Sequence, residues 1–91
     1  MPYNKTDLER ILGSPRRIRI LREMVRNQGP LSVYRIRVLT GLRTGDVKKH
    51  LQILVDAGIV REMKMNDQRI YMLDGENPVV KALIELFKVS L

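Results

Sequence analysis

Residues 41–60, GLRTGDVKKHLQILVDAGIV, decide the fold of this chain. They predict a short turn, a helix of about three turns at residues 44–57, and a glycine stop that leads into a β-prone run. At 3.6 residues per turn, the apolar side chains gather on one side of the helix: Val47, Leu51, Leu54 and Val55. Small, basic and polar residues gather on the other: Gly45, Lys48, Lys49 and Gln52. The pattern predicts a helix that packs on one side and presents a basic side outward.

The distribution of charge indicates the kind of partner. The chain has 91 residues, enough for one domain with a single modest core, and a formal net charge of +7. Residues 16–49 contain ten basic and two acidic residues, a local charge of +8, so the basic excess belongs to one region. Such a localised excess favours nucleic acid as the partner, with an anionic membrane surface as the second alternative.

Several classes of function find no support in the sequence. The chain has no cysteine, which excludes disulfides and thiolate metal sites. It also lacks an apolar run of the roughly 18 residues that a membrane span needs, and MPYNKTDLER at its start is no signal peptide. We see no carboxylate pair, activated nucleophile or phosphate loop. We therefore expect a cytoplasmic, nucleoid-associated protein that is not an enzyme, uses no cofactor or metal and has no membrane partner.

Local signals predict a mainly α fold with a small β-hairpin, in one domain that spans residues 1–91. Ser14, Ser32, Thr44 and Asn77 are each predicted as the N-cap of a helix. The expected helices lie at about residues 8–12, 15–27, 33–39, 44–57 and 78–90. Between the last two, residues 59–65 and 69–73 predict a hairpin with a three-residue tip, Asn66-Asp67-Gln68.

These residues resemble the ArsR-like winged-helix transcription regulators. The resemblance covers about residues 8–73, in GSPRRIRIL, TGLRTGDVKKHLQILVDAGIV and RIYML. Its most specific part is a spaced set of eight residues: Val47, His50, Leu51, Leu54, Ala57, Gly58, Ile59 and Val60. In that family the matching helix lies in the DNA major groove, the hairpin is a wing (residues 59–73), and the terminal helices form a homodimer. Metal sensing is not implied, because the chain has no cysteine and His50 is its only histidine.

The resemblance and the charge pattern together predict the residues that contact double-stranded DNA. Arginine and lysine suit phosphates and guanine edges, threonine suits phosphate, and a glycine lets the backbone approach closely. The predicted DNA-binding residues are Arg43, Thr44, Gly45, Lys48, Lys49, Gln52, Lys64, Asn66, Gln68 and Arg69.

Other polar and aromatic residues have competing interpretations. Arg19, Arg22 and Arg26 form a stripe that is either a second set of phosphate contacts or an ordinary solvated face. Arg17 is expected to be structural, with its stem packed and its head paired. His50 is expected to pack and to form hydrogen bonds rather than to bind a metal, and Tyr71 is expected in the core.

The last helix predicts self-association, because its apolar arc covers well over half of its circumference. The predicted dimer-interface residues are Val80, Leu83, Ile84, Phe87 and Leu91. Alternatively, residues 1–12 cover this surface. For the whole chain, we favour a homodimeric regulator that binds specific DNA sites. The competing hypothesis is a winged-helix protein-interaction module, an accessory subunit of a transcription or replication complex.

Overall fold

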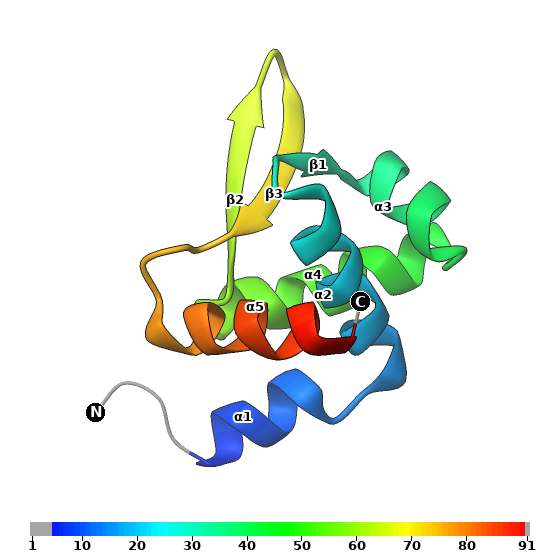
Figure 1. Ribbon diagram of the computed structural model, residues 1–91. Helices are drawn as coiled ribbons and strands as arrows, with labels where there is room; N and C mark the ends of the chain where they lie inside the picture. Colours follow the sequence, from blue (N-terminus) through cyan, green and yellow to red (C-terminus); the bar gives the residue numbers. More distant parts are fainter. Residues whose placement is uncertain (1–4, 91) are drawn as a thin grey trace.

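The computed structural model describes residues 5–90, and the side chains of residues 8–89. Within residues 5–90, five helices and three short strands follow one another (Figure 1). They are α1 (Lys5–Leu12), α2 (Pro15–Asn27), β1 (Leu31–Ser32), α3 (Val33–Thr40), α4 (Thr44–Asp56), β2 (Val60–Met65), β3 (Gln68–Leu73) and α5 (Pro78–Ser90). The predicted mainly α fold with a small hairpin is confirmed, and the hairpin of β2 and β3 projects from a helical body.

Side-chain caps set the start of three helices, as the sequence predicts. The Ser14 hydroxyl accepts a hydrogen bond from a backbone N–H of the first turn of α2 at 3.3 Å, and Ser32 does the same for α3 at 3.1 Å. The Asn77 side-chain oxygen accepts from the first turn of α5 at 2.8 Å. Each cap satisfies an N–H that has no partner within the helix.

The start of α4 differs from the prediction. Thr44 is already helical, and the N-cap is Arg43, whose side chain makes no capping hydrogen bond. The prediction that Thr44 caps this helix was therefore wrong. Asp46 lies in the first turn, where a carboxylate interacts favourably with the positive end of the helix dipole. At the other end, Gly58 adopts φ +77°, as predicted for the residue that ends the helix.

The hairpin has a tighter tip than predicted and a third strand beside it. Gln68 pairs with Met65, so only Asn66 and Asp67 form the turn, with φ +52° and +65°. Two consecutive residues with positive φ suit a two-residue turn that matches the twist of the strands. The short strand β1 adds to β3 through Leu31, opposite Tyr71, which gives the order β1-β3-β2.

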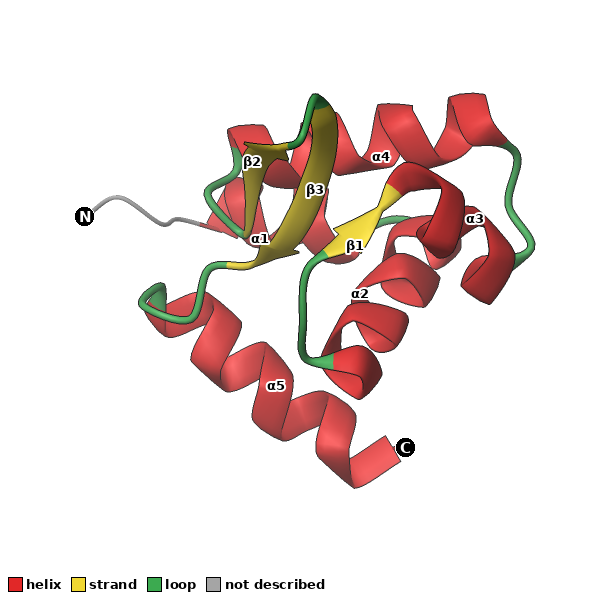
Figure 2. Cartoon of the chain, turned by 90° about the horizontal axis from the view of Figure 1, so that it is seen from above, coloured by secondary structure: helices red, strands yellow, loops and turns green. Residues whose placement is uncertain are grey.

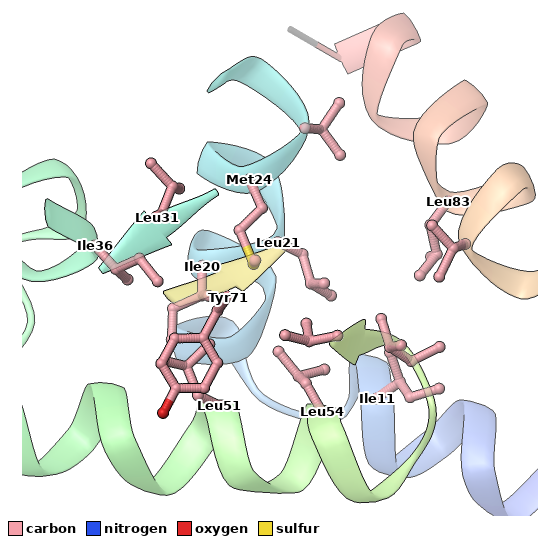
Figure 3. Close-up of a cluster of buried hydrophobic side chains, with 14 of the residues drawn as sticks. Ile11, Ile20, Leu21, Met24, Leu31, Ile36, Leu51, Leu54, Tyr71 and Leu83 are labelled. Carbon is pink, nitrogen blue, oxygen red and sulfur yellow. The ribbon is translucent and has the colours of Figure 1, made fainter. Parts of the chain in front are cut away.

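Helix α2 forms the centre of the domain. Ile20, Leu21 and Met24 of α2 are almost completely buried, and they meet side chains from α3, α4, the sheet and α5 (Figure 3). Viewed from above, α4 and α5 lie on opposite sides of α2, and both helices pack against it (Figure 2). The outer surfaces of α4 and α5 therefore point in different directions and are available to different partners. Among the helices of residues 5–90, none is long and apolar enough to cross a membrane.

The rotation of α5 about its axis corrects the predicted dimer interface. Val80, Leu83 and Phe87 lie in the core of the monomer, so the prediction that they face a second copy was wrong. Ile84 is partly buried at the edge of that core, and Leu91 lies outside the described residues. The apolar residues that α5 does turn outward are Ala82, Leu86 and Val89, the last two 58% and 87% exposed. The helix has two apolar faces, and the sequence alone did not indicate which one turns inward.

Candidate nucleic-acid interface

The outer face of α4 and the turn before it form a basic surface. All six residues predicted there are exposed: Arg43, Thr44, Gly45, Lys48, Lys49 and Gln52. The same helix buries Val47, Leu51 and Leu54 on its other side, which holds it against α2 and α3. A Cβ placed on Gly45 would meet no atom within 4 Å, so this part of the surface is open. The predicted separation of α4 into a packed and an outward side is present in the structure.

A hollow of about 530 Å³ separates α4 from the hairpin. Four of the predicted residues line it: Lys48 and Gln52 from α4, and Gln68 and Arg69 from β3. Of the two other predicted hairpin residues, Lys64 and Asn66 are exposed but do not line the hollow. The tertiary fold thus brings two distant parts of the sequence to one concave surface.

The first turn of α3 also lines this hollow, which the sequence alone did not indicate. Ser32 and Tyr34 belong to the lining, with Tyr34 largely exposed. The start of a helix carries unpaired backbone N–H groups and a partial positive charge, both of which attract phosphate. Ser32 was recognised only as a cap. The sequence did offer one signal for this contact, because the start of α3 lies only about eleven residues before the start of the basic helix α4.

The Glu62 carboxylate holds two polar side chains of the hairpin. Glu62 accepts hydrogen bonds from the Tyr71 hydroxyl at 2.8 Å and from Arg69 Nη1 at 3.3 Å. Burial raises the pKa of Tyr71, and the hydrogen bond to Glu62 raises it further, so the phenol stays protonated. Tyr71 is a core residue, as predicted. Arg69 therefore already has an anionic partner within the hairpin.

His50 joins α4 to α2 through Arg17. The Arg17 guanidinium Nη1 lies 3.1 Å from His50 Nδ1. Because guanidinium can only donate, the imidazole accepts at Nδ1 and is neutral. Burial lowers the pKa of His50, and the charge of Arg17 lowers it further. His50 packs in the core and forms a hydrogen bond, as predicted. The head of Arg17 is paired through Nη1, whereas the Nε of Arg17 is buried without a hydrogen-bond partner among the described residues.

Two arginines of the α2 stripe interact with the protein itself. Arg19 Nη1 donates to the carbonyl oxygen of Thr40 at 3.4 Å, near the end of α3. Arg26 forms an ion pair with Glu23 at 2.9 Å. These contacts favour a structural role for Arg19 and Arg26 over direct contact with phosphates.

The part of the chain that the structure describes contains no cluster of metal-ligating side chains. Within it, no three histidine, cysteine, aspartate or glutamate residues come together as ligands for an ion. The organised surface is instead the basic face of α4 together with the hollow beside the hairpin.

Helices α2, α3 and α4 followed by the β2–β3 hairpin, with a basic outer face on α4, define a winged helix-turn-helix protein, a class of DNA-binding domains. A family model described as bacterial regulatory protein, arsR family, matches residues 14–62, more than half of the chain. The chain belongs to the ArsR family of bacterial regulatory proteins. It is a DNA-binding transcription regulator, from a family of regulators rather than of enzymes.

Solved structures agree with this assignment. HlyU from Vibrio cholerae is 28% identical with a TM-score of 0.76, over 89% of this chain and 84% of that one. The cadmium metal-sensor CMTR from Mycobacterium tuberculosis is 31% identical with a TM-score of 0.70, over 94% and 86% of the two chains. The homodimeric winged helix-turn-helix DNA-binding domain of Mb0332 from Mycobacterium bovis is 27% identical with a TM-score of 0.73, over 93% and 78%. A search of curated proteins found no match.

Proposed function

We propose that this protein binds specific sites on double-stranded DNA as a homodimer. Helix α4 lies in the major groove, and the β2–β3 hairpin lies on the adjacent backbone or in the minor groove. The observation that carries the proposal is the hollow between them, where Lys48, Gln52, Gln68 and Arg69 come together from two elements. A phosphate backbone placed there would meet cations and amide donors from both sides.

Base contacts belong to the outer face of α4. Arg43, Thr44, Gly45 and Lys49 lie on α4 or at its entrance but outside the lining of the hollow. Side chains near the start of a recognition helix are the ones that reach base edges. Lysine and arginine suit guanine acceptors there, and the missing side chain of Gly45 lets the helix approach closely.

The homodimer forms through the outward apolar stripe of α5. Ala82, Leu86 and Val89 lie along one side of the helix, and Leu8 of α1 is also 46% exposed. A patch of this kind favours burial against a second copy. The Mb0332 domain is homodimeric, which supports a homodimeric state for this chain. Two recognition helices would then contact half-sites about one helical turn, ~34 Å, apart.

Metal independence and a cytoplasmic location near the nucleoid belong to the same proposal. CMTR is described as a cadmium sensor, so the family includes metal-dependent members. This chain has no cysteine to serve as a thiolate ligand. We expect DNA affinity to be unchanged by EDTA and by added cadmium or zinc. A change of tenfold or more with either would overturn the metal-independent part of the proposal.

The decisive experiment first selects bound fragments from genomic DNA and then measures affinity for the selected site by fluorescence anisotropy. We compare the wild type with Lys48→Ala, Lys49→Ala and the double variant. Lys81→Ala is the matched control, because it removes the same charge from the exposed polar side of α5. Affinity should fall with each α4 variant and stay near wild type for Lys81→Ala.

The salt dependence makes the test quantitative. Each phosphate contact contributes about 0.9 to the slope of log affinity against log salt. The proposal gives a phosphate contact to Lys48 and a base contact to Lys49, so the double variant removes two phosphate contacts per dimer, and the slope should become shallower by about 2. Wild-type affinity and slope in the double variant would overturn the assignment of α4. Absence of salt-sensitive DNA binding by the pure wild-type protein would favour the protein-interaction module instead.

A further inference from the structure

A second hollow lies at the junction of α2, β3 and α5, and the proposed DNA contacts use none of its residues. Its volume is about 330 Å³, within the range of small-molecule sites in proteins. Figure 2 shows the three elements that frame it, with α5 on one side and α2 and β3 on the other. The apolar part of the lining consists of Met24, Val25, Met72, Leu73 and Ile84.

The lining combines adaptable apolar walls with one cation. Methionine side chains are flexible and polarisable, so Met24 and Met72 can follow the shape of an apolar guest. Lys88 supplies the single charge among the described residues that line the hollow, and Gln28 adds an amide. Lys88 pairs with Glu85 at 3.5 Å, and both side chains are mostly exposed. An exposed ion pair of this length is weak, so the ammonium can exchange it for an anionic ligand.

We propose that this hollow, the α2–β3–α5 cavity, binds an organic monocarboxylate with an apolar body. The carboxylate would meet the Lys88 ammonium and the Gln28 amide, and the body would contact the methionines and Ile84. At roughly 30 Å³ per non-hydrogen atom, as in liquid water, a volume of about 330 Å³ holds about eleven such atoms, close to the twelve of decanoate with its two oxygens. A ten-carbon fatty acid and a substituted aryl acid share the required chemistry.

The position of the cavity gives its ligand a regulatory role, which rests on the proposed DNA-binding function. β3 belongs to the hairpin, and α5 carries the proposed dimer stripe. A guest that wedges these elements apart or holds them together would change how the hairpin and the two copies are placed against DNA. A ligand shifts DNA affinity only if it binds the two arrangements differently. The expected change in DNA affinity is threefold or more.

Methionine methyl signals test occupancy without DNA. With ¹³C-methyl methionine in the full chain, Met24 and Met72 report on the cavity. Met63 and Met65 on β2 serve as internal controls, because they do not line it. Titration with sodium decanoate should shift the two cavity signals saturably and leave the two β2 signals nearly unchanged. Uniform or unsaturable shifts would overturn the site.

The charge and the volume of the cavity are tested by separate variants. Decanoate should bind about fivefold more tightly than 1-decanol, the value of one exposed charge contact. Lys88→Gln should remove that preference, whereas Lys81→Gln on the same helix should retain it. Ile84→Trp should fill the cavity and abolish the binding of both probes, with folding checked from the same methyl spectrum. Equal binding of decanol and decanoate to the wild type would overturn the carboxylate assignment.

Two further measurements test the class of ligand and its regulatory role separately. A substituted benzoate in place of decanoate distinguishes an aryl from an alkyl body, and tighter binding of either identifies the better occupant. Anisotropy with the selected DNA site is then measured with the cavity saturated. Occupancy without a change in DNA affinity would overturn the regulatory role and leave the site standing. Failure of the wild type to bind DNA would overturn the proposed function, while the methyl titration would still test the cavity.

Discussion

Replacing Leu86 by alanine tests the outward stripe of α5 as the dimer surface. Leu86 is 58% exposed in the monomer, so more than half of its side chain remains to be buried by a partner. Complete burial of a leucine contributes about 1.5–3 kcal/mol. The exposed part therefore contributes about 1 kcal/mol per copy. In a symmetric dimer the residue counts twice, so Leu86→Ala should cost about 2 kcal/mol, or roughly 30-fold in the dimer Kd.

Sedimentation equilibrium over a range of concentrations measures that Kd directly. Val38→Ala is the matched control, because Val38 on α3 is an apolar residue of similar exposure, 50%, away from α5. Circular dichroism checks that both variants remain folded, as expected for substitutions at exposed positions. A Kd for Leu86→Ala equal to that of Val38→Ala and the wild type would refute the placement of the dimer surface on this stripe.

Two further predictions concern α4. Gly45→Ala should stabilise the fold by up to about 0.5–1 kcal/mol, because alanine favours a helix and its Cβ meets no atom within 4 Å. Gly45→Leu should fold equally well, but its larger side chain should keep α4 away from DNA and weaken DNA binding at least tenfold. Denaturant unfolding and anisotropy measure the two effects, and unchanged DNA affinity in Gly45→Leu would contradict close approach at this position. For His50, the folded-state pKa lies below the unfolded value of about 6.5, so the unfolded state binds the proton more readily. The stability that comes from neutral His50 should therefore be fully present above about pH 6.5 and should decline as the pH falls towards the folded-state pKa. Melting temperatures measured between about pH 7.5 and 5 should show this loss of stability in the wild type and a smaller loss in His50→Gln.

The elements that the sequence predicted well are those specified by local chemistry. Ser14, Ser32 and Asn77 each cap a backbone N–H two or three residues away, so the signal and its effect lie within one turn of the chain. The alternation of packed and exposed residues along α4 is also local, because it depends only on helical period. For this reason the outer face of α4 was predicted correctly, residue by residue.

The features that were missed depend on pairing and packing between distant segments. The sequence suggested a brief extended segment at Leu31 but not its partner, because β1 forms only when Leu31 meets Tyr71 across the sheet, and two residues are too few to show a periodic pattern. The pairing of Glu62 with Arg69 and Tyr71 likewise follows from the register of β2 and β3. These pairings form only once the hairpin register is set, and a turn of two residues rather than three changes that register.

By itself, the sequence determined that this chain forms a helical domain with a hairpin and a basic outward side on α4. Helical period, caps and the concentration of charge within residues 16–49 were sufficient for that. Only the tertiary structure decided which apolar face of α5 turns inward. Val80 and Leu86 are both apolar, and which of them is buried depends on the rotation of α5 about its axis where it packs against α2. It also decided that α4 and the hairpin share one hollow, and that α2, β3 and α5 enclose another. A concave surface forms where separate elements meet, so its residues become neighbours only when the chain has folded.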